Sequence, residues 1–293
     1  MLRVGCMQPD QGRFFLKMKR IVVMNPKGGS GKTTIAINLA SYFASRQQSP
    51  VLMDFDPQGS STRWVKKRQP TQASIHAIAA FENNGRTTRA FQMRVPENAS
   101  HIIVDTPAAV ESREMPEITK GADKILVPVL PSDIDIHACS RCIRDLLLVA
   151  KIRREDDRIG VIANRIRRNT LTYQTLIRFL QTLGIPIVAT IRDSQNYVRA
   201  AELGIGVHEM KSYVAQADVE QWEPLVAWLD KPSGNQAVTA QALTAQALTT
   251  QALTAQALTT QALTTQALAA QTLTAQTPPT AEEPPPTPAI ASG

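Results

Sequence analysis

The segment Asn25-Pro-Lys-Gly-Gly-Ser-Gly-Lys-Thr-Thr34 joins an apolar run, Ile21–Met24, to an amphipathic helical pattern, Thr33–Ser45. Glycines let a backbone curl so that successive N–H groups point at phosphate oxygens, and the start of a helix adds partial positive charge. The order of strand, glycine-rich loop and helix therefore predicts a loop that binds the phosphates of a nucleotide, rather than an ordinary turn.

Two side chains of this loop are expected to bind the phosphates and their metal ion. Lys32 would reach the β and γ phosphates of ATP, and the Thr33 hydroxyl would bind Mg²⁺. Pro26 occupies the place of the usual first glycine, and the loop instead matches a variant with a lysine, Lys27, ahead of the glycine pair. The loop residues expected to contact the nucleotide are Lys27, Gly28, Gly29, Ser30, Gly31, Lys32, Thr33 and Thr34.

Short runs rich in β-branched residues alternate with helical patterns such as Thr33–Ser45 and Ile136–Ile152. The runs are nearly all apolar, which is typical of strands buried on both faces of a parallel sheet. They are Ile21–Met24, Val51–Met53, Ile102–Val104, Ile125–Val129, Gly160–Ala163 and Ile187–Ala189. The alternation predicts an α/β fold with a doubly wound, mostly parallel sheet flanked by helices, which binds ligands at the carboxyl ends of its strands.

The loop and several later strand segments, taken in their order along the chain, resemble the partition ATPases of the ParA/MinD group. These ATPases carry a deviant Walker A motif in a P-loop NTPase fold. The resemblance covers about residues 18–230, and the loop is most similar to that of small plasmid partition ATPases (ParF-like) that lack an N-terminal helix-turn-helix domain. It implies an ATPase that hydrolyses ATP to ADP and phosphate with Mg²⁺. The segments that carry it are residues 25–34, 51–60, 101–107, 125–131 and 161–164.

The resemblance also assigns roles to individual residues. Lys27 corresponds to a signature lysine that reaches the partner subunit's nucleotide and offsets phosphate charge there, as an arginine finger does. Asp105 would hold the water shell of Mg²⁺, with Asp54 near the metal and Asp56 orienting the attacking water. For the pair Asp54 and Asp56, an Asp-Pro turn capped by a carboxylate is the alternative. Asn164 corresponds to a residue that hydrogen-bonds the adenine edge, although an Asn at a strand end is also a common turn residue.

Arginines gather between Arg158 and Arg199, where the only acidic residue is Asp193. Guanidinium groups bind phosphates well, and no recognition helix is apparent, so this pattern favours DNA binding without sequence preference. A solvated basic face is the alternative. The candidate DNA-binding residues are Arg165, Arg167, Arg168, Arg178, Arg192 and Arg199.

His137, Cys139 and Cys142 lie within six residues of one another but do not predict a metal or redox site. A structural zinc site needs four ligands, and no second Cys/His pair exists, so buried helix cysteines are expected. Three cysteines in 293 residues do not make a disulfide framework, no apolar run is long enough to span a membrane, and no signal peptide is recognisable. We therefore expect a cytoplasmic protein.

Composition divides the chain into three expected parts. Residues 1–17 form an N-terminal extension, residues 18–232 an ATPase domain, and residues 233–293 a tail with a Gln-Ala-Leu-Thr repeat and a Pro-rich end. The tail holds no Lys, Arg or aromatic residue, although the whole chain carries a net charge of +7. A stretch of this composition lacks the large apolar groups that offset the entropy of ordering, so it is expected to be disordered.

The leading functional hypothesis is a nucleotide switch. ATP binding closes a homodimer that binds nucleoid DNA without sequence preference, and a ParB-like or cargo-adaptor partner then stimulates hydrolysis and release. The cargo would be plasmid or chromosomal DNA, or a protein assembly. A MinD-like membrane regulator needs a basic C-terminal amphipathic helix, which this tail lacks. A metabolic P-loop relative usually lacks the signature lysine, and a related tyrosine kinase would have a tyrosine-rich tail.

Overall fold

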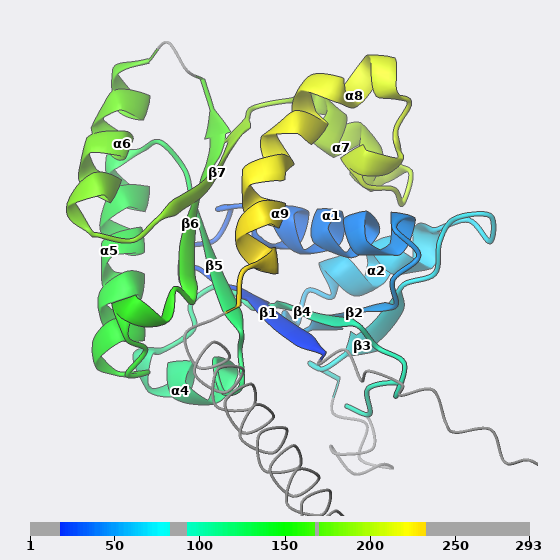
Figure 1. Cartoon of the computed structure of the whole chain (residues 1–293), viewed down its shortest axis with the longest axis horizontal. Coiled ribbons are helices and arrows are strands. Elements are labelled where there is room, and N and C mark those ends of the chain that lie inside the picture. Colours follow the sequence, from blue (N-terminus) through cyan, green and yellow to red (C-terminus); the bar gives the residue numbers. More distant parts are fainter. Residues whose placement is uncertain (1–17, 83–92, 168–169, 233–293) are drawn as a thin grey trace, which may run out of the picture. The chain divides into compact units, whose positions relative to one another are not determined.

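The computed structural model describes residues 18–82, 93–167 and 170–232, which form an α/β domain (Figure 1). The expected extension, the expected tail and Arg168 lie outside the described residues. Seven strands form one sheet in the order β3-β2-β4-β1-β5-β6-β7, and every neighbouring pair is parallel. The strands are β1 (Lys19–Val23), β2 (Pro50–Asp54), β3 (His76–Ala79), β4 (His101–Asp105), β5 (Lys124–Val129), β6 (Ile159–Ile166) and β7 (Ile187–Arg192). The predicted doubly wound parallel sheet is confirmed.

Helices cover both faces of this sheet (Figure 1). One face packs against α4 (Met115–Ile118), α5 (Asp133–Leu148) and α6 (Leu171–Thr182). The other face packs against α1 (Lys32–Ser45), α2 (Ser60–Lys67), α7 (Gln195–Glu202) and α9 (Glu223–Asp230), while α8 (Ser212–Val219) follows α7. No helix in the described ranges is long and apolar enough to cross a membrane.

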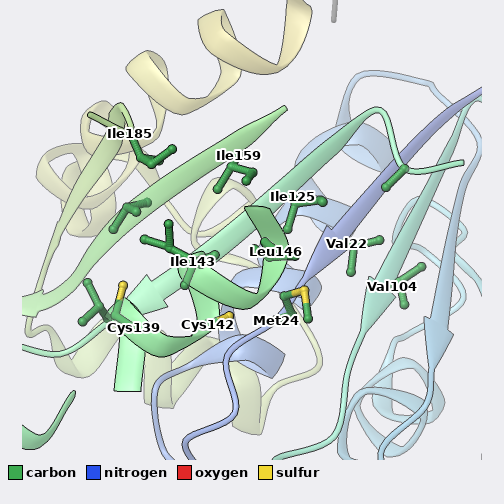
Figure 2. Close-up of a cluster of buried hydrophobic side chains, with 14 of the residues drawn as sticks. Val22, Met24, Val104, Ile125, Cys139, Cys142, Ile143, Leu146, Ile159 and Ile185 are labelled. Atoms are coloured by element: carbon green, nitrogen blue, oxygen red, sulfur yellow. The ribbon is translucent and has the colours of Figure 1, made fainter. Parts of the chain in front are cut away.

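Side chains that alternate along β1 show why the strands are almost wholly apolar. Val22 and Met24 join the core under α5, whereas Ile21 and Val23 join the core under α1. Successive strand residues point to opposite faces, so a strand covered on both faces needs an apolar residue at every position. The core under α5 is drawn in Figure 2.

Cys139 and Cys142 belong to that core (Figure 2), and each is 0% exposed on α5. Burial raises the pKa of the Cys139 thiol to about 12 and that of the Cys142 thiol further still. A thiol held in its protonated form is a poor nucleophile and a poor metal ligand. The prediction that these are buried helix cysteines is confirmed.

Helix α5 differs from its predicted bounds at both ends, strands β6 and β7 extend beyond the predicted runs, and one strand was not predicted. Helix α5 begins at Asp133 rather than Ile136, because Ser132 caps it by accepting a hydrogen bond from the Asp135 amide at 3.2 Å. It also ends at Leu148, before Ile152. Strand β3 has the sequence His-Ala-Ile-Ala, which has little intrinsic preference for a strand, and it forms by pairing with β2.

The register of the central strands gathers acidic residues at one end of the sheet. Asp105 of β4 lies opposite Asp54 of β2 on one side and opposite Val23 of β1 on the other. Because the strands are parallel, this edge is also where β1 leads into the glycine-rich loop.

Candidate nucleotide-binding site

The loop between β1 and α1 depends on glycines with a left-handed backbone. Gly29 has a φ of 79° and Gly31 a φ of 94°, and Gly31 is the N-cap residue of α1. A Cβ atom at Gly31 would lie 2.2 Å from the Asn164 amide nitrogen, so the loop also needs glycine there for close packing. The loop, with the first turn of α1 behind it, has the conformation expected of a phosphate cradle.

Asn25 anchors the start of the loop, a role that the sequence analysis missed. Its side chain is fully buried; its amide donates to the carbonyl of Pro128 at 2.7 Å, and its oxygen accepts from the Lys27 amide at 2.9 Å. The sequence offers a signal, because an Asn before Pro at a strand end is a typical turn residue. The partner on β5 is about a hundred residues away and leaves no such signal.

The ammonium of Lys32 lies inside the curl of the loop. Its Nζ donates to the carbonyl of Lys27 at 3.3 Å, and the residue is 7% exposed. Burial lowers its pKa, while the nearby carboxylates of Asp105 and Asp56 act in the opposite direction. A buried cation that folds back on a glycine-rich loop is well placed to bind an anion such as a phosphate.

Asp105 is buried, and its carboxylate has no hydrogen-bond partner among the described residues. The residue is 0% exposed. Burial raises its pKa to about 7, although the hydroxyls of Thr33 and Ser61 lie close enough to oppose that rise. A buried carboxylate is costly unless it is paired, so this group, with Thr33 beside it, fits a divalent cation.

Asp54 and Asp56 show the turn arrangement that the sequence left open. Asp54 accepts from the Asp56 amide with one oxygen and from the Thr62 amide with the other, each at 3.0 Å. The half-buried Asp56 accepts from the Gln58 amide at 2.9 Å. Because each carboxylate oxygen has two lone pairs, these contacts leave capacity for water or metal. Roles of both residues toward Mg²⁺ and water stay predictions.

Lys27 forms an ion pair within its own chain. Its Nζ lies 2.7 Å from Oδ2 of Asp135 on α5, and that same oxygen accepts a hydrogen bond from the Ser132 hydroxyl. The Asp135 side chain is 4% exposed, and that of Lys27 is 32% exposed. The sequence analysis did not single out Asp135, which lies 108 residues from its partner.

Asn164 lies against the loop, at the end of β6. Its amide donates to the Ser30 carbonyl at 2.9 Å, and its oxygen accepts from the amide of Arg165. A cavity of about 440 Å³ opens beside these contacts. The loop glycines, the end of β6 and the start of α7 line it, including Gly29, Gly31, Asn164, Arg165, Asp193 and Tyr197. The cavity is where a base attached to loop-bound phosphates would be expected, next to Asn164.

The candidate DNA-binding arginines do not form one uniform patch. Arg165 and Arg167 share the carboxylate of Asp193, and Arg192 binds Asp218 through two nitrogen atoms, at 2.5 and 3.1 Å. The other two described candidates, on α6 and α7, are exposed and make no ion pair with any described residue. They are Arg178 and Arg199.

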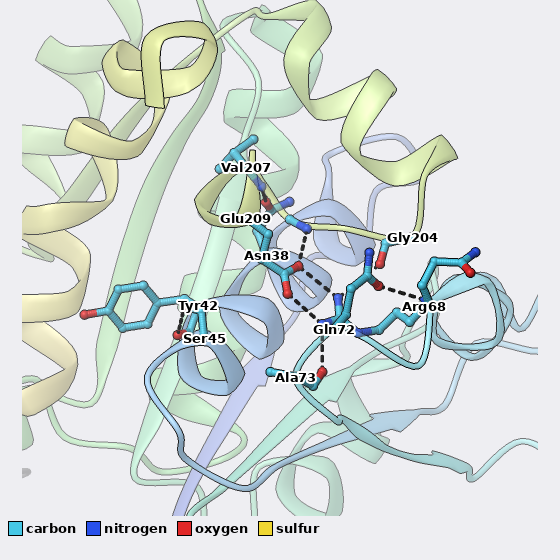
Figure 3. A network of polar contacts seen from close by, with 11 residues as sticks. Asn38, Tyr42, Ser45, Arg68, Gln72, Ala73, Gly204, Val207 and Glu209 are labelled. Atoms are coloured by element: carbon cyan, nitrogen blue, oxygen red, sulfur yellow. Dashed lines mark hydrogen bonds and ion pairs between the residues drawn. The ribbon is translucent and has the colours of Figure 1, made fainter. Parts of the chain in front are cut away.

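A polar network braces the two helices that begin at the site (Figure 3). Arg68, after α2, binds the carboxylate of Glu209 at 2.6 Å and the Gly204 carbonyl at 3.0 Å. On α1, Asn38 donates to the Thr34 carbonyl and accepts from the Val207 amide, each at 2.8 Å. The sequence analysis did not predict this network, which fixes α1 and α2 to the segment after α7.

Comparisons with known proteins identify a nucleotide-binding family. Residues 21–207 match the profile of the family described as "CobQ/CobB/MinD/ParA nucleotide binding domain". The chain is 28% identical over 213 residues to the maintenance of carboxysome distribution protein A of Gloeobacter kilaueensis, covering 72% of this chain and 94% of that protein. It is 54% identical over 145 residues to the chromosome partitioning protein ParA of Myxococcus xanthus, covering 37% and 51%.

The fold agrees as well. The solved structure of apo McdA from Cyanthece matches with a TM-score of 0.57 at 19% identity, covering 71% of this chain and 99% of that one. At such low identity the match shows the fold alone, whereas the family profile spans more than half of the sequence. The chain therefore belongs to the CobQ/CobB/MinD/ParA family of nucleotide-binding proteins, among its ParA/MinD-type partition and positioning ATPases.

Proposed function

We propose that this protein is a Mg²⁺-dependent ATPase that dimerises on binding ATP, binds DNA without sequence preference and positions DNA or a protein cargo. The observation that carries the enzymatic part is the buried carboxylate of Asp105, which has unpartnered oxygens and lies near Lys32. A buried carboxyl group without hydrogen bonds, beside a buried cation and an anion-binding loop, fits a metal–nucleotide complex better than it fits a purely structural core.

Each group at the site has a task in this proposal. Lys32 neutralises phosphate charge, and Thr33 and Asp105 hold Mg²⁺, with Asp54 on the metal side. When bound, the metal supplies charge stabilisation at the phosphate oxygens. Asp56, half-buried beside the site, orients the attacking water.

Dimerisation is proposed from Lys27. Its side chain is partly exposed, so it can leave Asp135 and reach the phosphates of a second subunit. A cation supplied in trans would stabilise charge on the transferred phosphate, which makes full activity depend on two subunits. The relatives' names, which refer to carboxysome distribution and chromosome partitioning, support the proposed positioning role.

The proposed location is the cytoplasm, on nucleoid DNA, with a ParB-like or cargo-adaptor protein as the second partner. The exposed arginines of α6 and α7 are the described groups best placed to meet DNA phosphates. Binding through phosphates alone would ignore base sequence.

The test measures mass by light scattering and DNA binding by fluorescence anisotropy, with ADP and with a non-hydrolysable ATP analogue. The proposal expects a dimer with the analogue only, and DNA binding that is much tighter with the analogue than with ADP. Unrelated duplexes should bind equally, and affinity should fall steeply with salt. Equal DNA binding in both nucleotide states, or a strong preference for one sequence, would contradict the proposal.

A further inference from the structure

One carboxylate, that of Asp193, holds two of the candidate DNA-binding arginines. Its Oδ1 accepts a hydrogen bond from Nε of Arg165 at 3.3 Å, and its Oδ2 accepts one from Nη2 of Arg167 at 3.0 Å. Both arginines lie at the end of β6, and Asp193 directly follows β7. Each carboxylate oxygen thus takes one N–H of one arginine, and its negative charge competes with a phosphate for that guanidinium group.

The two arginine side chains are more exposed than the carboxylate that holds them. The side chains of Arg165 and Arg167 are 61% and 79% exposed, and that of Asp193 is 27% exposed. Hydrogen bonds from Arg167 and Arg165 help to lower the pKa of Asp193, so the carboxylate is charged at neutral pH. The contacts therefore form a charged clamp at the surface, which solvent and salt can weaken.

The backbone at Arg165 is in an unusual conformation. Its φ is 52°, in the left-handed region, and the register of β6 on β7 shifts between Ala163 and Ile166. An arginine in this region is strained, so surrounding contacts must hold it there. One of them is the oxygen of Asn164, which accepts a hydrogen bond from the Arg165 amide at 3.0 Å.

That contact continues into the nucleotide site. The amide of Asn164 donates to the Ser30 carbonyl of the loop at 2.9 Å. Because Asn164 also accepts from the Arg165 amide and Arg165 donates to Asp193, a continuous path of contacts joins the loop to Asp193. Arg165 and Asp193 also line the cavity of about 440 Å³ beside the loop. A ligand that fills this cavity therefore lies next to Arg165 and Asp193. Arg167 does not line the cavity, so a ligand would affect it only through Asp193.

We propose that Asp193 is an intramolecular competitor of DNA phosphate: its carboxylate holds Arg165 and Arg167, and a nucleotide in the adjoining cavity favours their release. This inference rests on the proposed DNA binding. It names one contact through which nucleotide adds to that binding, beside dimerisation. A partly exposed ion pair changes an equilibrium by about fivefold or less, so the clamp weakens DNA binding without abolishing it.

The test replaces Asp193 in the full chain and measures anisotropy of a mixed-sequence duplex without nucleotide, with ADP and with a non-hydrolysable ATP analogue. We expect Asp193→Asn to tighten nucleotide-free binding by about fivefold. Two released arginines should steepen the log–log salt slope of this state by about 1.8. Binding with the analogue should change little, because the clamp is already open there.

Three further variants separate the clamp from a simple gain of positive charge. Glu155→Gln changes the charge equally at an exposed position before β6, at the other end of that strand, and should have little effect. Asp193→Glu keeps the carboxylate and should behave as the wild type does. Adding Arg167→Ala to Asp193→Asn should remove most of the gain. Thermal melting of each variant shows whether it is folded.

The outcomes distinguish this inference from the proposed function. The clamp is overturned if the wild type binds DNA with the analogue while Asp193→Asn leaves nucleotide-free binding unchanged. It is also overturned if Glu155→Gln gives the same gain, or if the gain survives the loss of Arg167. Absence of DNA binding by the wild type and by Asp193→Asn in every nucleotide state overturns both the clamp and the proposed DNA binding.

Discussion

The ammonium of Lys27 lies 2.7 Å from the carboxylate of Asp135, a contact between the phosphate-binding loop and the first turn of α5. Oδ1 of Asp135 is buried and has no hydrogen-bond partner among the described residues. The carboxylate therefore depends on Lys27 and on the Ser132 hydroxyl for compensation. A lysine engaged in this way must give up a short contact before it can serve a second subunit.

Removing the charge of Asp135 should favour the dimer. We expect Asp135→Asn to dimerise at an analogue concentration about fivefold lower than the wild type needs, since Lys27 no longer breaks an ion pair. Light scattering across an analogue titration measures this. Asp133→Asn is the matched control, because that side chain is 86% exposed on the same helix turn. An unchanged or weaker dimer would show that the contact does not oppose association.

Lys32 and Asp56 should separate binding from turnover. Lys32→Ala should abolish ATP binding, because the loop then lacks its buried cation. Asp56→Asn retains the oxygen that caps the turn at Gln58 but loses the negative charge, so ATP binding and dimerisation should persist while turnover falls by about 100-fold or more. Equilibrium binding of a fluorescent ATP analogue and phosphate release measure the two steps. Normal turnover in the Asp56 variant would remove its assigned role.

Replacing each of the two left-handed loop glycines with alanine should lower the free energy of unfolding by a different amount. Gly29→Ala adds only backbone strain, because no atom lies within 4 Å of the new Cβ, and should lower the free energy of unfolding by about 1 kcal/mol. Gly31→Ala also brings a Cβ atom into a clash with Asn164 and should lower the free energy of unfolding by more. Adding Asn164→Ala should recover part of that difference in urea denaturation. Equal costs for the two glycine variants would indicate that the loop relaxes away from Asn164.

His101 should make the protein sensitive to acid. Its ring stacks on Phe43, and burial lowers its pKa from 6.5 to about 4. The unfolded chain therefore binds more protons between pH 4 and 6.5, so stability falls as the pH drops through this window. His101→Phe should remove up to about 3 kcal/mol of that loss, measured by urea denaturation at pH 4.5 and 7. His76→Gln, at an exposed position, is the control for the loss of a histidine.

The sequence predicts those parts of the fold that local patterns encode. Ile21–Met24 and Ile125–Val129 identify buried strands because β-branched runs suit a sheet covered on both faces. The four residues of β3 carry no such pattern, since neighbouring strands stabilise them. Likewise, Ser132 followed by Asp135 is a visible helix start, which extends α5 beyond the predicted boundary.

In the candidate site, too, local patterns predict some residues and contacts between distant segments determine the others. The loop lysines and glycines can be assigned from spacing, because the chemistry of phosphate binding fixes their order along the chain. Contacts between distant segments cannot: Asn25 with Pro128 and Lys27 with Asp135 each join residues more than a hundred positions apart. Their formation depends on strand order and register, which the side-chain pattern of a single strand does not specify.

Asp54 holds the turn at Asp56 with one carboxylate oxygen and the first turn of α2, at Thr62, with the other. A descendant of this protein that gave up the proposed hydrolysis and kept only nucleotide sensing could lose Asp56 at little structural cost. It could not lose Asp54 so easily, because the turn and the helix would each lose an anchor. In degenerate copies of such a gene, Asp54 should therefore outlast Asp56, and its presence alone would be a poor indicator of catalytic activity.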